Sequence, residues 1–143
     1  MSRFYLAGCL IGEQLIISNL KIKTMKEFML IIRTQGDHLE SLPADQQQPH
    51  LQKLMNYIGG LMRNEILNSA QPLEMEGTII SGSKGKFKDG PFNETKEVIA
   101  GYFLIKANNL QEAVEIAKAN PVLEDGENAR IEVRPIKIMA GIN

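Results

Sequence analysis

Residues that could carry acid-base chemistry gather in one segment of the chain, Asp89-Gly90-Pro91-Phe92-Asn93-Glu94-Thr95-Lys96-Glu97. The segment holds three carboxylates and one lysine beside a turn-forming Gly-Pro pair, and a strand-like run follows it directly. Loops attached to rigid strands are common places for binding groups. A carboxylate next to a neutralising lysine could act as a general base, so Asp89 and Glu94 are the candidate catalytic residues.

A structural role for these same side chains stays open. An aspartate at the start of a turn accepts hydrogen bonds from backbone N–H groups, which would account for Asp89 without any chemistry. Glu94 and Glu97 could simply border the entrance to the strand. Lys96 could bind a ligand, or it could form a salt bridge to a second subunit.

Two arginines and a tyrosine are further candidates for holding a ligand. Glu132 and Arg134 lie two residues apart on a predicted strand, so they share a face. Arg134 could bind a ligand carboxylate through two parallel hydrogen bonds, or it could pair internally with Glu94 or Glu97, which is the interpretation we favour. If the first and last strands are neighbours, Arg33 and Arg134 would form a small basic patch at the sheet end. Tyr102 is expected to line the core or a cleft between subunits.

The two histidines, His38 and His50, could also transfer protons. An Asp37-His38 pair in one loop could orient a general base, but sequence neighbours rarely point at each other, which favours a solvated His38. His50 is expected in the first turn of a helix, on the surface or against a partner subunit. Two histidines and one cysteine, Cys9, without metal-binding spacing give no support for a metal centre or a nucleophilic thiol, and we expect no cofactor.

Composition indicates one soluble domain. The chain has 143 residues, a net charge of −1 and scattered basic residues, so nothing indicates direct binding to nucleic acid or to a membrane. A single cysteine favours a reducing compartment, and we expect a cytoplasmic protein. Leu6-Ala7-Gly8-Cys9 resembles a lipoprotein cleavage site, but the five residues before it are too few for an export signal. We expect residues 1–24 to be an extension, with Met25 as a possible natural start, and residues 25–143 to form the domain.

The elements that must position these side chains follow from periodicity. An apolar stripe at steps of three and four predicts a helix near residues 49–64, and an Asn-Leu-Gln-Glu capping box predicts a second helix over 110–119. Apolar or alternating runs predict the strands, which are 26–33, 74–81 with a hairpin turn onto 84–88, 98–106 and 130–139.

The element order predicts an α+β fold with a ferredoxin-like split βαβ arrangement, in which an antiparallel sheet carries two helices on one face. The strand at 98–106 is apolar on both faces, so the face without helices must also be covered. A second copy of the same sheet would cover it, which predicts a homodimer with a two-fold contact.

Several segments in this order resemble the YCII-related family, and most closely its DGPF subgroup. The segments, within residues 26–138, are Phe28-Met-Leu-Ile-Ile-Arg33, Asp89 to Glu97, Gly101-Tyr102-Phe103, Leu110-Gln-Glu-Ala-Val114 and Ile131-Glu-Val-Arg-Pro135. The resemblance implies a dimeric α+β barrel built on a ferredoxin-like unit. It implies no defined reaction: some relatives are called enzymes because a cleft holds polar residues, and others are encoded beside alternative sigma factors. Asn93 and Asn68-Ser69-Ala70 depart from the pattern.

Two functions therefore fit the sequence. The first is binding of a small molecule in a cleft near the Asp89–Glu97 loop, with Asp89 or Glu94 as acid or base, and with Lys96 and Arg134 holding an anionic group. The second is a non-catalytic regulatory or partner-binding module. The first predicts a concave pocket with unpaired polar groups, whereas the second predicts paired charges and an exposed apolar patch.

Overall fold

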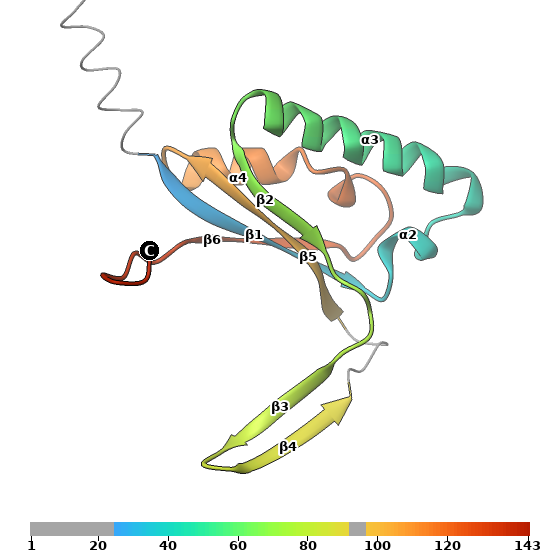
Figure 1. Ribbon diagram of the computed structural model, residues 1–143. Helices are drawn as coiled ribbons and strands as arrows, with labels where there is room; N and C mark the ends of the chain where they lie inside the picture. Colours follow the sequence, from blue (N-terminus) through green and yellow to red (C-terminus); the bar gives the residue numbers. More distant parts are fainter. Residues whose placement is uncertain (1–24, 92–96) are drawn as a thin grey trace, which may run out of the picture.

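A computed structural model describes residues 25–91 and 97–143 of the chain (Figure 1). The elements in chain order are β1 (Lys26–Gln35), α2 (His38–Ser41), α3 (Ala44–Arg63), β2 (Leu67–Pro72), β3 (Thr78–Ser83), β4 (Lys86–Pro91), β5 (Glu97–Ala107), α4 (Leu110–Lys118), the 3-10 helix η1 (Pro121–Leu123) and β6 (Arg130–Pro135).

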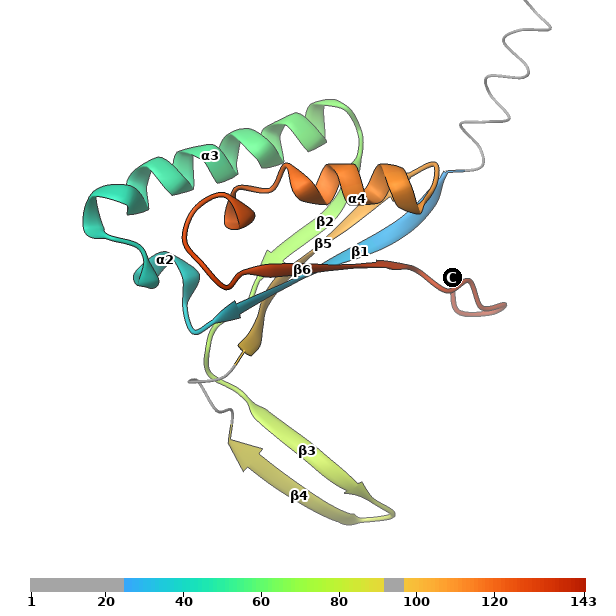
Figure 2. The same cartoon turned by 180° about the vertical axis from the view of Figure 1, so that it is seen from behind.

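Four strands form one antiparallel sheet in the order β2-β5-β1-β6. The two long helices, α3 and α4, lie on the same side of this sheet (Figures 1 and 2). This confirms the predicted ferredoxin-like α+β fold. The sheet of the described chain is open and does not close into a barrel.

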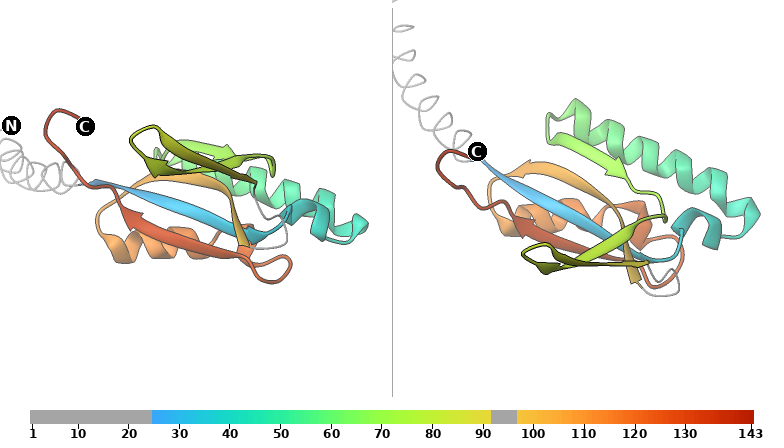
Figure 3. Two further views of the ribbon diagram at one scale, coloured as in Figure 1. Left: turned by 90° about the horizontal axis from the view of Figure 1, so that it is seen from below. Right: turned by 60° about the horizontal axis from the view of Figure 1, so that its bottom comes forward.

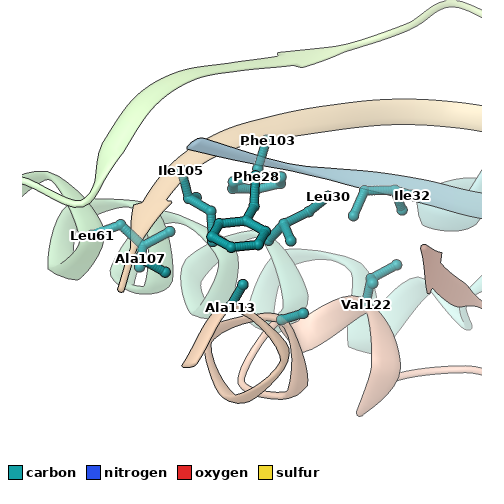
Figure 4. Packing of buried hydrophobic residues seen from close by; sticks show 10 residues of the cluster. Phe28, Leu30, Ile32, Leu61, Phe103, Ile105, Ala107, Ala113 and Val122 are labelled. Atoms are coloured by element: carbon teal, nitrogen blue, oxygen red, sulfur yellow. The ribbon is translucent and has the colours of Figure 1, made fainter. Parts of the chain in front are cut away.

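The core lies between the sheet and the helices. β1 and β5 occupy the centre of the sheet, and alternate residues of both strands point toward the helices, as the period of two requires. Phe28 pairs in register with Ile105, and Leu30 pairs with Phe103. All four are buried, and Ala113 of α4 and Leu61 of α3 close the layer from the helix side (Figure 4).

The opposite face of the sheet carries a half-buried apolar stripe with a charged border. The stripe consists of neighbouring pairs from β1 and β5, Met29 with Leu104 and Ile31 with Tyr102. The helices lie on the other side of the sheet and the β3–β4 hairpin leads away from it, so we call this side the open face (Figure 1). The border lies on β6, whose outward residues are Arg130, Glu132 and Arg134.

β3 and β4 pair only with each other and form a hairpin that extends away from the body of the molecule, on the side opposite to the helices (Figures 1 and 2). The predicted hairpin is present, but its turn is Lys84-Gly85 rather than Gly82-Ser83. Both turn residues have positive φ angles, 52° and 80°, as a tight two-residue hairpin turn requires.

Two further local predictions were wrong. α3 begins at Ala44 rather than near Pro49, because the glutamines before Pro49 are good helix formers and the Gln46 N–H closes a first turn on the Pro43 carbonyl at 2.8 Å. Residues 68–72 were expected to break the pattern, yet they belong to strand β2, an edge strand that tolerates polar residues. Within the described residues no helix is long and apolar enough to cross a membrane.

Candidate functional site

A pocket of about 350 Å³ lies between the helix-bearing face of the sheet and the N-terminal half of α3. This volume is in the range of sites for small molecules. β2 and β5 form its floor, and α2, α3 and the segment at η1 form its sides. Most of the lining is apolar, with Leu54, Ile58 and Phe103 among its members, while His38 and His50 supply imidazole groups.

His50 is held in the wall of the pocket by a carboxylate. Its side chain is only 5% exposed, and its Nδ1 lies 2.8 Å from Oδ2 of Asp125, which follows η1 in the chain. A carboxylate accepts hydrogen bonds, so the neutral ring donates through Nδ1–H and keeps Nε2 as its acceptor and base. Of the two positions predicted for His50, the one on the surface was therefore wrong, and the one against a partner subunit stays a prediction.

Asp125 is in turn held as an anion. Its Oδ1 accepts a hydrogen bond from the Lys53 ammonium at 3.1 Å. The hydrogen bond from His50, followed by that from Lys53, holds the pKa of Asp125 below its usual value. An ionised Asp125 fixes the orientation of the His50 ring and would stabilise the imidazolium after proton uptake.

His38 is the second imidazole of the pocket. Its ring centroid lies 5.1 Å from that of His50, and its Nε2 is buried without a hydrogen-bond partner among the described residues. Burial, and then the nearby His50, lower the pKa of His38, so its neutral form is favoured. The expectation of a solvated His38 was wrong.

Asp37 does not orient His38. Its Oδ1 accepts a hydrogen bond from the Glu40 N–H at 3.0 Å, so this aspartate caps the N-terminus of α2. Asp37 therefore has a structural role as a helix cap, and the predicted Asp37-His38 pair does not orient a general base. The carboxylate that serves a histidine here belongs to Asp125, far along the chain, and its partner is His50.

The arrangement can bind and protonate or deprotonate a small molecule. An apolar cavity keeps the reacting group of a ligand away from bulk water. Hydrogen bonds between that group and a base in the cavity wall are therefore stronger than they would be in water. His50 has the features of a general base, since its ring is oriented by a carboxylate. His38 offers a neutral imidazole whose Nε2 lacks a hydrogen-bond partner among the described residues. Within residues 25–91 and 97–143 no group of His, Cys, Asp and Glu side chains is placed to hold a metal.

The structure brings together only part of the site predicted from sequence. β1 and β6 are neighbours, as the expected Arg33 and Arg134 patch required. However, Glu132 lies between the two arginines: its Oε1 is 3.0 Å from Nη2 of Arg33, and its Oε2 is 3.7 Å from Nη1 of Arg134. Arg134 has an internal ionic partner, but it is Glu132 and not the expected Glu97, and the alternative partner Glu94 lies outside the described residues. Glu97 is bound by Arg130 instead.

Of the other predicted residues, the structure describes Asp89 and Tyr102. Asp89 is exposed on β4 and faces across the hairpin toward Ile80. Tyr102 borders the pocket through its place on β5, and its hydroxyl lies 3.5 Å from that of Ser69 on the edge strand. Glu94 and Lys96 lie outside the described residues. The roles assigned to these residues stay predictions.

Sequence reasoning missed His50 and Asp125 as a pair, because 75 positions separate them. One pattern could have pointed to His50. It precedes Leu54 and Ile58 by steps of four, so it shares a helix face with the apolar stripe. A histidine on an apolar face needs a buried partner, and the sequence alone does not say which acid supplies it.

The fold and the position of the pocket define a small α+β protein with a ligand-sized cavity beneath one helix. A model of the YCII-related domain matches residues 26–137, and the chain belongs to this family. Comparison with curated proteins finds no match.

Proposed function

We propose that this protein binds a small, mainly apolar molecule in the pocket beneath α3, and that His50 exchanges a proton or a hydrogen bond with a polar atom of that molecule. The observation that carries the proposal is the His50–Asp125 contact of 2.8 Å in the wall of a cavity of about 350 Å³. This keeps the small-molecule function expected from sequence and moves its acid-base group from the Asp89–Glu97 loop to α3.

The composition of the cavity supports this assignment. Apolar walls favour an apolar ligand, and a few fixed polar groups orient it. Burying a histidine and a carboxylate costs desolvation, and a histidine that its carboxylate orients toward a cavity is suited to contact a ligand there. Ala100 and Gly101 also line the cavity, and they follow Glu97 closely, so the proposed site adjoins the end of the predicted loop.

The test is a titration of the full chain with three small probes, phenol, cyclohexanone and benzoate, followed by the imidazole signals in ¹H–¹⁵N correlation spectra. Binding should shift the signals of His38 and His50. The variants His50→Gln and Asp125→Asn should weaken the best probe about 3-fold to 10-fold, the range of one neutral hydrogen bond.

Arg134→Met is the matched control, because Arg134 lies on the open face outside the pocket. It should leave probe binding unchanged. Loss of binding in Arg134→Met with retention in His50→Gln would move the site back to the sheet end and overturn the proposal. A lack of any shift at both histidines with all probes would also count against it.

The second candidate is a non-catalytic partner-binding module, and a specific observation favours it. Arg33 and Glu132 are already paired, and the β3–β4 hairpin exposes apolar side chains, as this alternative expects. It predicts that His50→Gln changes stability but no ligand response.

We also infer that the chain belongs to the DGPF subgroup of the family. Asp89-Gly90-Pro91-Phe92 and the segments that follow it in order support this placement.

A further inference from the structure

The β3–β4 hairpin is an element without a packing partner in its own chain. It forms a separate two-stranded sheet and extends from the body on the side of the open face (Figures 1 and 3). An isolated two-stranded hairpin is marginally stable in water at best. A hairpin of this length therefore needs another surface to pack against.

The two faces of the hairpin differ. Ile80 and Phe87 lie on one face, and they are 64% and 63% exposed. Ile79 lies on the other face with Lys86 and Lys88. Large exposed apolar side chains that gather on one face mark a contact surface.

The open face of the main sheet is the complementary surface. Met29, Ile31, Tyr102 and Leu104 form its apolar stripe, and the helices lie on the other side of the sheet. One chain thus presents two apolar surfaces on one side of its sheet. A two-fold contact between two copies buries both surfaces at once, because each copy supplies a hairpin and a sheet.

Size favours this contact. Four strands about 4.8 Å apart and about 20 Å long outline about 400 Å² of sheet, which is about half of the 800 Å² that each partner buries in a standard interface. The hairpin supplies further area. A six-residue strand rises about 20 Å, and two sheets packed face to face lie about 10 Å apart, so the hairpin is long enough to reach past the edge of the partner's sheet.

Charge favours it as well. Residues 78–91 carry three lysines and one aspartate, whereas residues 25–77 and 97–143 carry nine basic and 14 acidic side chains. At long range a positively charged hairpin is therefore attracted to the negatively charged body of another copy, although Lys86 and Lys88 lie on the face opposite to Ile80 and Phe87. Asp89 shares the face of Ile80 and Phe87. Repulsion between two hairpins directs each of them to a body and away from the other hairpin.

We propose that the β3–β4 hairpin is an arm that clasps a second copy of this chain, with Ile80 and Phe87 packed on the partner while the two open faces meet. The homodimer expected from sequence then depends on the hairpin as well as on the sheet.

The first test compares hairpin variants by sedimentation equilibrium across micromolar concentrations. Ile80→Ser and Phe87→Ser should each raise the dimer dissociation constant at least tenfold. Ile79→Ser is the matched control, the same substitution one residue away on the other face, and it should change the constant less than threefold. Circular dichroism checks that the sheet and helices persist, which is expected for exposed positions.

The second test distinguishes a hairpin that contacts a second copy from a hairpin that folds back on its own chain. Equal amounts of ¹⁴N and ¹⁵N chains are mixed, equilibrated and treated with a carbodiimide that joins lysines to carboxylates. Clasping predicts mixed-label peptide pairs that join Lys84, Lys86 or Lys88 to carboxylates of the body. A monomeric wild-type chain, equal effects of Ile79→Ser and Ile80→Ser, or hairpin pairs of one label only would overturn the proposal.

Discussion

His38 and His50 differ in one respect that decides how each can act. His50 has a carboxylate partner at 2.8 Å, whereas the Nε2 of His38 has none among the described residues. Gly126 packs against His38, since a Cβ at that glycine would lie 3.1 Å from Cε1 of the ring. The partial burial of the ring, together with the nearby His50, lowers the pKa of His38 and disfavours its protonated form.

This difference predicts a pH dependence of stability. Because burial and His50 lower the pKa of His38 from 6.5, the unfolded chain binds a proton that the folded chain does not, and the free energy of unfolding falls as the pH drops below about 6.5. In His38→Gln that part of the fall should disappear. Urea unfolding from pH 5 to 8 measures it. Parallel curves for the two proteins would contradict the prediction.

The sequence predicted which charged residues lie together on the sheet, but not which of them form ion pairs. Glu132 and Arg134 were expected on one face, and the structure agrees. The choice of Arg33 as the closer partner of Glu132 depends on the register between β1 and β6, and no residue pattern fixes that register. The His50–Asp125 pair was missed for a related reason, since it joins a helix to a distant loop.

At the scale of elements, locally encoded structure was predictable. The expected Asn109 cap of α4 is present, because Oδ1 of Asn109 accepts from the Glu112 N–H at 2.8 Å, while the Glu112 carboxylate accepts from the side chain of Asn108 at 3.0 Å. The strands β1 and β5 are runs of apolar residues, which are typical of strands at the centre of a sheet. The edge strand β2 was not predictable, since its residues are polar and its pairing with β5 comes from tertiary structure.

Gly101 is required where β2 meets β5. A Cβ at this position would lie 2.6 Å from the carbonyl oxygen of Gln71, closer than real contacts allow. Gly101→Ala should therefore cost about 1–3 kcal/mol of unfolding free energy. Gly90→Ala is the control, because its Cβ would meet nothing closer than 3.9 Å, and it should change stability by less than about 0.5 kcal/mol. Equal losses in urea unfolding would refute this explanation.

Tyr57 joins the two long helices. Its hydroxyl donates to the Ile116 carbonyl at 2.7 Å, and burial raises the pKa of Tyr57 to about 12. Tyr57→Phe should cost about 1 kcal/mol at pH 7. Since the folded pKa is raised, wild-type stability should decline as the pH rises from 10 toward 12, and the variant should lack that part of the decline.

Tyr102→Phe is the control for Tyr57→Phe, because the Tyr102 hydroxyl makes only a 3.5 Å contact with Ser69. We expect a change below about 0.5 kcal/mol at pH 7. A loss as large as that of Tyr57→Phe would show that the hydrogen bond between the helices is not the cause.

At the scale of the whole molecule, one sheet has two apolar faces, and the described chain covers only one of them. The helices of the same chain bury one face, and a second copy is proposed to bury the other. The fold class was predictable from element order and from the apolar character of both faces of β5. The extension of the hairpin away from the body was not predictable. Residues 78–91 alternate as in any hairpin, and this pattern does not indicate which surface they pack against.

Adjacent positions on β1 separate the two faces. Leu30 is fully buried under the helices, so Leu30→Ala should cost about 2–5 kcal/mol of unfolding free energy at any protein concentration. Met29 is half-buried on the open face, and at high dilution Met29→Ala should cost at most about half as much. If the open face contacts a second copy, the loss in Met29→Ala should grow as the protein concentration rises, because association stabilises the folded chain by mass action. Urea unfolding at two concentrations a hundredfold apart measures both effects. A loss in Met29→Ala that is independent of concentration would leave the open face without a partner copy.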